Sequence, residues 1–208
     1  MADENYHKLL LVIGIVSLIA SGFMAQDLFT WVLEVSPAII GLFILVFTYK
    51  KFRFSNLVYT LILMHAFILM YGGIYTYAET PFGFWMQEFF GWNRNNYDKI
   101  GHLAQGFVPA FIIRELFLRL NVINETRRRW LPWIVISIVL AGSAFYEFIE
   151  WWVALASGSA GDAFLGTQGY IWDTQSDMFL ALLAAIFALI FFSRFHNNSI
   201  QKNKSVIV

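Results

Sequence analysis

The sequence predicts an all-helical membrane protein with six spans, and three observations lead to that fold class. Of the 208 residues, 59% are hydrophobic and 13% are charged, whereas soluble domains are about 25% charged. The apolar residues form long runs, without the alternation that a transmembrane barrel shows. Because lipid offers the backbone no hydrogen-bond partners, such runs must be helices. We therefore expect a single membrane domain over residues 1–208.

Six runs are long enough to cross the bilayer, since a helix needs about 20 mostly apolar residues to span the hydrocarbon layer. The first run is short, and Gln26 and Asp27 follow it in place of a small-residue cleavage site, so we expect a retained helix. The fourth run is polar. The expected spans are about 9–25, 29–49, 57–77, 98–120, 131–156 and 176–193.

Lys and Arg indicate the direction of the spans. Eleven of the 14 basic residues fall in the two tails or in the connections between spans 2 and 3 and between spans 4 and 5. The connections on the opposite side contain one basic residue, Arg94. Cytoplasmic loops carry the excess of Lys and Arg, so both termini are predicted to be cytoplasmic. We expect the polar tail 196–208 to be flexible.

Composition excludes several classes of function. The chain has no cysteine, which excludes disulfides and thiolate metal or redox sites. Its net charge is zero, so nothing indicates a nucleic-acid partner. The partner that the composition does predict is the lipid bilayer.

Span 4 opens with 97-YDKIGHLAQGFVPA-110 and carries the first group of candidate residues. Ionisable side chains within spans are costly, so each is a candidate for function. On a helix, Asp98, His102 and Gln105 lie within about 60° of one another, and the latter two about 6–11 Å below the outer end. Arg114 falls on nearly the opposite side, near the inner headgroups, and is predicted to be a separate anchor.

Span 5 contains 143-SAFYEFIEWW-152, in which Glu147 and Glu150 share a helical face. Their depth is about 9–14 Å below the outer end, similar to that of His102. Two buried carboxylates at this spacing cannot both stay ionised cheaply without a cation or a shared proton. The pair therefore predicts a site that contains one or the other.

The third group lies in 157-SGSAGDAFLGTQGYIWDTQSDMF-179, a glycine-rich loop that leads into span 6. Asp173 and Asp177 share a face if the helix has begun by Trp172. All three groups lie in the outer half of the protein, so we expect one shared site. The polar side chains expected to bind a substrate there are Lys99, Gln105, Thr167 and Gln168.

Structural roles compete with these functional ones. A membrane histidine such as His102 often only makes an interhelical hydrogen bond, and Asp98 is equally well explained as a helix cap. Lys99 could pair with Asp98 or with an acid of span 5. We expect Glu34 and Glu79, near outer span ends, to reach for water.

Three interpretations of the polar cluster remain open. One histidine with several carboxylates suits Mg²⁺, Mn²⁺, Ca²⁺ or Zn²⁺, although the spacing is not that of a known zinc motif such as HExxH. The same residues would serve a proton relay, or would only hold helices together. The metal ligands expected under the first interpretation are Asp98, His102, Glu147, Glu150, Asp173 and Asp177.

Three segments carry a resemblance to a known family: 98-DKIGHLAQGFVPA-110, 142-GSAFYEFIEWW-152 and 164-FLGTQGYIWDTQSDMFLAL-182. Together with the number and order of the spans, they resemble the YjdF family of bacterial inner-membrane proteins. The resemblance covers essentially the whole chain and implies a small multi-pass protein of the plasma membrane. It supplies no reaction. Tyr170 stands where we would expect an acid in the family pattern, which removes one ligand from a large metal cluster.

A looser pattern is similar to VanZ-like membrane proteins, which combine Asp-Lys-x-x-His, a later Glu and a later Asp. The matching positions here are Asp98, Lys99, His102, Glu147 or Glu150, and Asp177. This similarity favours a lipid or cell-envelope substrate. The leading hypothesis is hydrolysis or group transfer with Glu147, Glu150 and His102 as catalytic residues. A proton-coupled transporter and a non-catalytic assembly protein are the alternatives.

Overall fold

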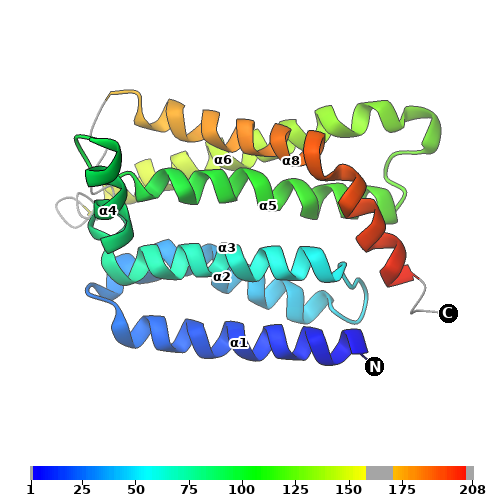
Figure 1. Ribbon diagram of the computed structural model, residues 1–208, viewed down its shortest axis with the longest axis horizontal. Helices are drawn as coiled ribbons and strands as arrows, with labels where there is room; N and C mark the ends of the chain where they lie inside the picture. The colour runs from blue at the N-terminus through cyan, green and yellow to red at the C-terminus, as the bar shows by residue number, and fades with distance from the viewer. Residues whose placement is uncertain (1, 158–170, 205–208) are drawn as a thin grey trace.

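Helices make up nearly all of the computed structural model, which describes residues 2–157 and 171–204. The long helices end at short turns, and no strand occurs within these ranges. The all-helical class is thereby confirmed (Figure 1). The helices are α1 Ala2–Met24, α2 Leu28–Thr48, α3 Asn56–Tyr75, α4 Pro81–Phe90, α5 Tyr97–Arg119, α6 Leu131–Ser157 and α8 Asp173–Lys204; short 3₁₀ helices cover Tyr77–Glu79 and Glu125–Trp130.

The six long helices of the described chain lie side by side, and the short helix α4 lies across one end of them (Figure 1). We call this the α4 end, and the opposite end, where both termini lie, the terminal end. Helix α3 packs against α1, α2 and α5, while α5, α6 and α8 pack against one another. The bundle therefore consists of two groups of three helices that meet where α3 contacts α5.

Five segments are long and apolar enough to cross a membrane. Helix α5, which has 23 residues and lies lengthwise in the bundle, is not among them, because its charged and other polar residues leave it too polar. It remains the sixth span of our prediction. The five segments are Asp3–Met24, Leu28–Thr48, Asn56–Tyr75, Glu125–Ala156 and Asp173–Lys202.

Two expectations about the elements were wrong. The tail after residue 196 was expected to be flexible, but α8 continues to Lys204 because the buried side chains of His196 and Ile200 pack on the protein. Helix α4 was not expected. Pro81 opens it, and Gly91, with a φ of 66°, ends it in the left-handed conformation that glycine adopts readily.

Close contact between α5 and α8 brings the polar groups together. A Cβ on Gly106 would collide with the backbone carbonyl of Ala181, so the two helices touch only because this residue is glycine. The apolar core of buried side chains lies farther toward the terminal end and includes Val58, Phe111 and Val135. Polar and apolar parts of the interior are thus separated along the helices.

Candidate functional site

A hollow of about 110 Å³ lies among the helices near the α4 end, and its wall contains most of the predicted site residues. Helices α2, α3, α5, α6 and α8 all contribute to it. The wall mixes carboxylates, a histidine pair and tyrosines with a few apolar side chains. Its members are Glu34, Pro37, His65, Leu69, Tyr77, Asp98, Gly101, His102, Gln105, Tyr146, Glu150, Asp173 and Asp177.

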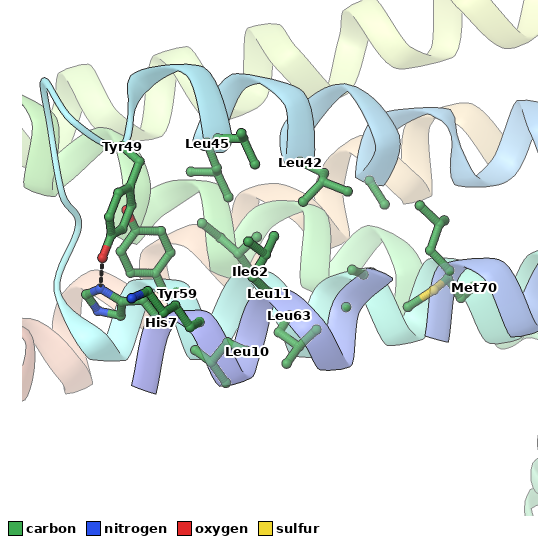
Figure 2. Close-up of a pocket in the computed structure, with 16 residues that line it drawn as sticks. His7, Leu10, Leu11, Leu42, Leu45, Tyr49, Tyr59, Ile62, Leu63 and Met70 are labelled. Atoms are coloured by element: carbon green, nitrogen blue, oxygen red, sulfur yellow. Dashed lines mark hydrogen bonds between the residues drawn. The ribbon is translucent and has the colours of Figure 1, made fainter. Parts of the chain in front are cut away.

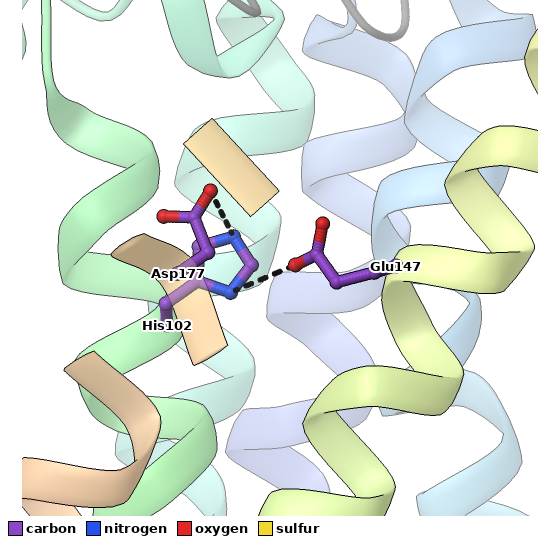
Figure 3. Close-up of side chains that lie close together, drawn as sticks. All are labelled: His102, Glu147 and Asp177. Carbon is purple, nitrogen blue, oxygen red and sulfur yellow. Dashed lines mark ion pairs between the residues drawn. The ribbon is translucent and has the colours of Figure 1, made fainter. Parts of the chain in front are cut away.

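His102 is at the centre of a three-helix contact (Figure 3). Its Nδ1 lies 3.9 Å from Glu147 Oε1 on α6, and its Nε2 lies 3.7 Å from Asp177 Oδ2 on α8. One ligand atom from each of the three side chains falls within 4.8 Å of the others, and all three residues are buried. Glu147 on α6 thus faces His102 on α5.

Gln105 and Ser143 orient the imidazole of His102. Gln105 Oε1 accepts a hydrogen bond from Ser143 Oγ at 3.3 Å and lies 3.1 Å from His102 Nδ1. A carbonyl oxygen only accepts hydrogen bonds, so Nδ1 is the donor toward Gln105, and Nε2 is the ring nitrogen that faces Asp177. Metal-ligating histidines usually have their second nitrogen held in this way.

A second cluster, closer to the α4 end, is an ion-pair network. Arg94 donates two hydrogen bonds to Asp173, at 2.6 and 3.2 Å. Lys99 Nζ lies 2.6 Å from Asp173, 2.7 Å from Asp177 and 3.3 Å from Asp98. Lys99 therefore pairs with Asp98, as one interpretation held, and also with Asp173 and Asp177 on α8.

The charge of Arg94 is stabilised by this network. Burial alone would lower the pKa of the Arg94 guanidinium, but hydrogen bonding and attraction to Asp173 outweigh burial and raise that pKa. Arg94 was noticed in the sequence only for the orientation of the spans. It lies in a connection between helices, where sequence gives no indication of which acid, 79 residues away, it will meet.

The carboxylates of the two clusters differ in how many cations and hydrogen-bond donors they contact. Asp173 accepts hydrogen bonds from two cations, whereas Glu147 Oε1 and Asp98 Oδ1 are buried and have no hydrogen-bond partner among the described residues. A buried carboxylate oxygen without a partner is costly. An added cation would therefore be stabilised most beside these two oxygens, of which Glu147 Oε1 lies next to His102, a residue of the hollow's wall.

Three further predicted residues have different outcomes. Glu150 lies in the wall of the hollow, outside the three-residue contact. Glu34, which was expected to reach for water, is buried and lines the hollow because α2 turns this face toward α5. Glu79 is exposed, as expected. Thr167 and Gln168 lie outside the described residues.

A buried polar network at the terminal end was not predicted. Glu115 accepts hydrogen bonds from the backbone and side chain of Ser55 and from Arg119, and it also contacts His196. Arg114, predicted to be a lone anchor, is instead buried beside His196, 3.1 Å away. These groups satisfy one another's hydrogen-bonding needs. We therefore interpret the network as a structural clamp that holds α3, α5 and α8 together.

A separate hollow of about 220 Å³ lies between α1, α2 and α3 (Figure 2). Apolar side chains, six of them leucines, form most of its wall, and His7 lies at its terminal end. His7 contacts the Tyr49 hydroxyl at 2.9 Å and Asn56 Oδ1 at 2.7 Å, so both of its nitrogens are engaged. Most of this hollow is therefore an apolar space, with its polar groups gathered at the end where His7 lies.

Comparison with known proteins places the chain in a family. Residues 6–198 match the model of a family described as predicted membrane protein (DUF2238). The chain belongs to this family. A relative, the inner membrane protein YjdF of Escherichia coli strain K12, is 49% identical over 185 residues, which cover 89% of this chain and 88% of the relative. No solved structure matches the chain.

The comparisons and the helices agree on location. The relative is an inner-membrane protein, and five segments of this chain are able to span a membrane. This DUF2238 protein is therefore a multi-pass protein of the bacterial inner membrane. The resemblance to the YjdF family is confirmed, while the chemistry of the polar hollow has to be argued from its residues.

Proposed function

We propose that the protein binds a divalent metal ion between His102, Glu147 and Asp177 and acts on the headgroup of a lipid or cell-envelope molecule. The observation that carries this proposal is the uncompensated oxygen of Glu147. It is buried without a hydrogen-bond partner among the described residues, although Arg94 and Lys99 neutralise the aspartates nearby. In the predicted orientation the α4 end faces the periplasm, where envelope headgroups lie.

The three side chains fit a metal ion chemically. One imidazole nitrogen and two carboxylates suit Mn²⁺ or Zn²⁺, and more water ligands would suit Mg²⁺. Two ligands bonded at about 2.0–2.2 Å to one ion are separated by at most about 4.4 Å. Since the three ligand atoms already lie within 4.8 Å of one another, small side-chain rotations are sufficient. We assign Asp98 and Asp173 to the ion pairs with Lys99 and Arg94 and leave them out of the proposed metal ligands.

The residues of the hollow then have distinct roles in hydrolysis. A divalent ion supplies Lewis-acid activation of water and of the bond to be broken. Glu150, which lines the hollow outside the ligand set, accepts the proton of the attacking water. The water oxygen joins the headgroup, the ester bond breaks, and the proton passes to the leaving oxygen. Gln105 holds the imidazole, which is a positioning role and replaces the substrate contact expected from the sequence.

Metal content tests this proposal directly. The purified protein, equilibrated with Mn²⁺ or Zn²⁺ and then freed of excess metal, should retain close to one ion per chain. Glu147→Gln and His102→Ala should lose it. The matched control is Glu79→Gln, which removes an exposed acid of the same end and should retain the ion.

Thermal unfolding separates the proposal from a purely structural role of the acids. Glu147→Gln should unfold near the wild-type temperature, because the glutamine carbonyl can still accept the hydrogen bond that Thr174 donates to Glu147, and Glu147 Oε1 accepts none within the described chain. A wild-type protein that retains no ion, or a Glu147→Gln protein that retains as much as wild type, would overturn the metal proposal. A large loss of thermal stability with unchanged complementation of a deletion strain would support the structural role.

Proton-coupled transport is a second candidate, favoured by the depth of the hollow. Glu34 on α2 and His65, near the middle of α3, line it together with His102. Titratable groups therefore lead from the α4 end toward the centre of the bundle, as a proton path requires. Proteoliposomes with a trapped pH indicator test this: proton flux that His65→Ala abolishes would support transport, and no flux with any of a broad solute panel would contradict it.

A further inference from the structure

An apolar groove continues from the polar hollow toward the terminal end. It has a volume of about 520 Å³ and runs along α3 between α2 and α5. Stripes of side chains at helical spacing form its wall, with Ala38, Ile44 and Leu45 on α2 and Val108 and Ile112 on α5. Water would find few hydrogen-bond partners in such a space, and apolar cavities stay dry.

The groove and the polar hollow share part of their wall. Pro37, His65 and Leu69 line both of them. The two spaces therefore adjoin, with carboxylates and His102 around the hollow and mostly hydrocarbon side chains along the groove, which has Thr48 and Lys51 in its wall as well. A soluble substrate would need only the polar part. A molecule with a polar end and an apolar chain would fill both.

The dimensions of the groove match one hydrocarbon chain. On α2 its wall extends from Pro37 to Thr48, which is about 17 Å at 1.5 Å per residue. Half the hydrocarbon core of a bilayer is about 15 Å thick. A cavity of about 150 Å³ holds one benzene molecule, so the 520 Å³ of the groove has room for a chain of several times that size.

Gly41 keeps the middle of the groove open. It lies on α2 in the wall, and a Cβ built there would meet no atom within 4 Å. Glycine costs helix stability relative to other residues, and a larger side chain would fit here without collision. Nothing in the packing of the described chain requires glycine at this position. Its effect is to leave space beside α3.

We infer that the groove holds the hydrocarbon chain of the substrate, which is a membrane lipid bound with its headgroup in the polar hollow. That the lipid is a substrate rests on the proposed function. That the groove binds a chain rests on its shape and apolar wall alone. The two statements can therefore fail separately.

Photo-crosslinking in proteoliposomes tests the groove. The probe is a phosphatidylethanolamine with a diazirine midway along one acyl chain, and labelled peptides are mapped by mass spectrometry. Labelling should concentrate on residues 37–48 and 108–120. In Gly41→Phe, labelling of 108–120 should fall several-fold, because the new ring occupies the space of the chain.

Gly142→Phe is the matched control. Gly142 lies on α6, and a Cβ there also meets no atom within 4 Å, so the same substitution adds a ring away from the groove. It should leave the labelling of 108–120 unchanged. Both variants should unfold near the wild-type temperature, since phenylalanine favours a helix more than glycine does.

Two outcomes would overturn the inference. One is labelling spread evenly over exposed apolar residues outside these ranges, such as Phe145 and Ile190, which face the surface. The other is unchanged labelling of 108–120 in Gly41→Phe. Metal content is measured on the same samples, and Gly41→Phe should retain its ion. Concentrated labelling without any bound metal would support the lipid groove and reject the proposed metal chemistry. Bound metal with even labelling would support the metal site and reject the lipid groove.

Discussion

Individual carboxylates in and beside the polar hollow have opposite environments. Asp173 receives hydrogen bonds from Arg94 and Lys99, while Glu147 Oε1, 3.9 Å from His102 Nδ1, has no hydrogen-bond partner in the described chain. The sequence predicts which acids are buried, because helical spacing and depth depend only on local geometry. It could not predict their partners, because Arg94 and Asp173 are 79 residues apart and meet only through the packing of α5 on α8.

Because Asp173 is paired with two cations, we expect it to stabilise the folded protein. Breaking a buried ion pair costs about 3–5 kcal/mol, and partial exposure of the partners lowers the expected cost of Asp173→Asn to about 2–3 kcal/mol. The partners Arg94 and Lys99 have side chains that are 21% and 18% exposed. A loss of this size lowers the melting temperature by roughly 5–10 °C, which thermal unfolding in detergent would measure. A melting temperature equal to that of the exposed-site variant Glu79→Gln would contradict this role.

At the scale of the elements, most helix ends could be predicted from the sequence, whereas the contacts between helices could not. The apolar runs predict the long helices to within a few residues at most ends, because about 20 apolar residues must cross the hydrocarbon layer. They do not predict α4, which is too short to span, or the extension of α8 to Lys204. That extension depends on His196, which contacts Glu115 on α5 at 3.1 Å, a tertiary contact that no local pattern in the tail reveals.

The contact between α5 and α8 makes a clear prediction about Gly106. Gly106→Leu would force its side chain into the carbonyl of Ala181, and backbone cannot move aside as a side chain does. We expect a loss of more than about 3 kcal/mol, beyond ordinary overpacking, and a fall in folded protein on size-exclusion chromatography. Gly142→Leu, at a glycine with open space, should stay within about 0.5 kcal/mol of wild type.

At the scale of the whole molecule, polar and apolar interiors occupy different ends. The α4 end holds the hollow with the acids and His102, the middle holds the apolar core and groove, and the terminal end holds the clamp around Glu115. Both termini lie at the same end (Figure 1), as an even number of crossings requires. The sequence predicts that both tails lie on the cytoplasmic side, because Lys and Arg are concentrated in the tails and in two connections.

Reporter fusions test the predicted orientation. A reporter that is active only in the periplasm should be inactive when fused after Val208 and active when inserted between Gly91 and Asn93, beside α4. The reason is that 11 of 14 basic residues flank the terminal end, and this excess stays in the cytoplasm. Activity after Val208 would show that α5 does not cross the membrane or that the whole bundle is inverted.

The central claim is that His102, Glu147 and Asp177 bind one metal ion, and anomalous diffraction tests it most directly. Crystals grown with Mn²⁺ or Zn²⁺, with data collected at the corresponding absorption edge, should show one strong anomalous peak within about 2.0–2.3 Å of ligand atoms from all three residues. The peak should be missing in Glu147→Gln. A map without a peak there, or with metal bound only to surface acids, would contradict the claim.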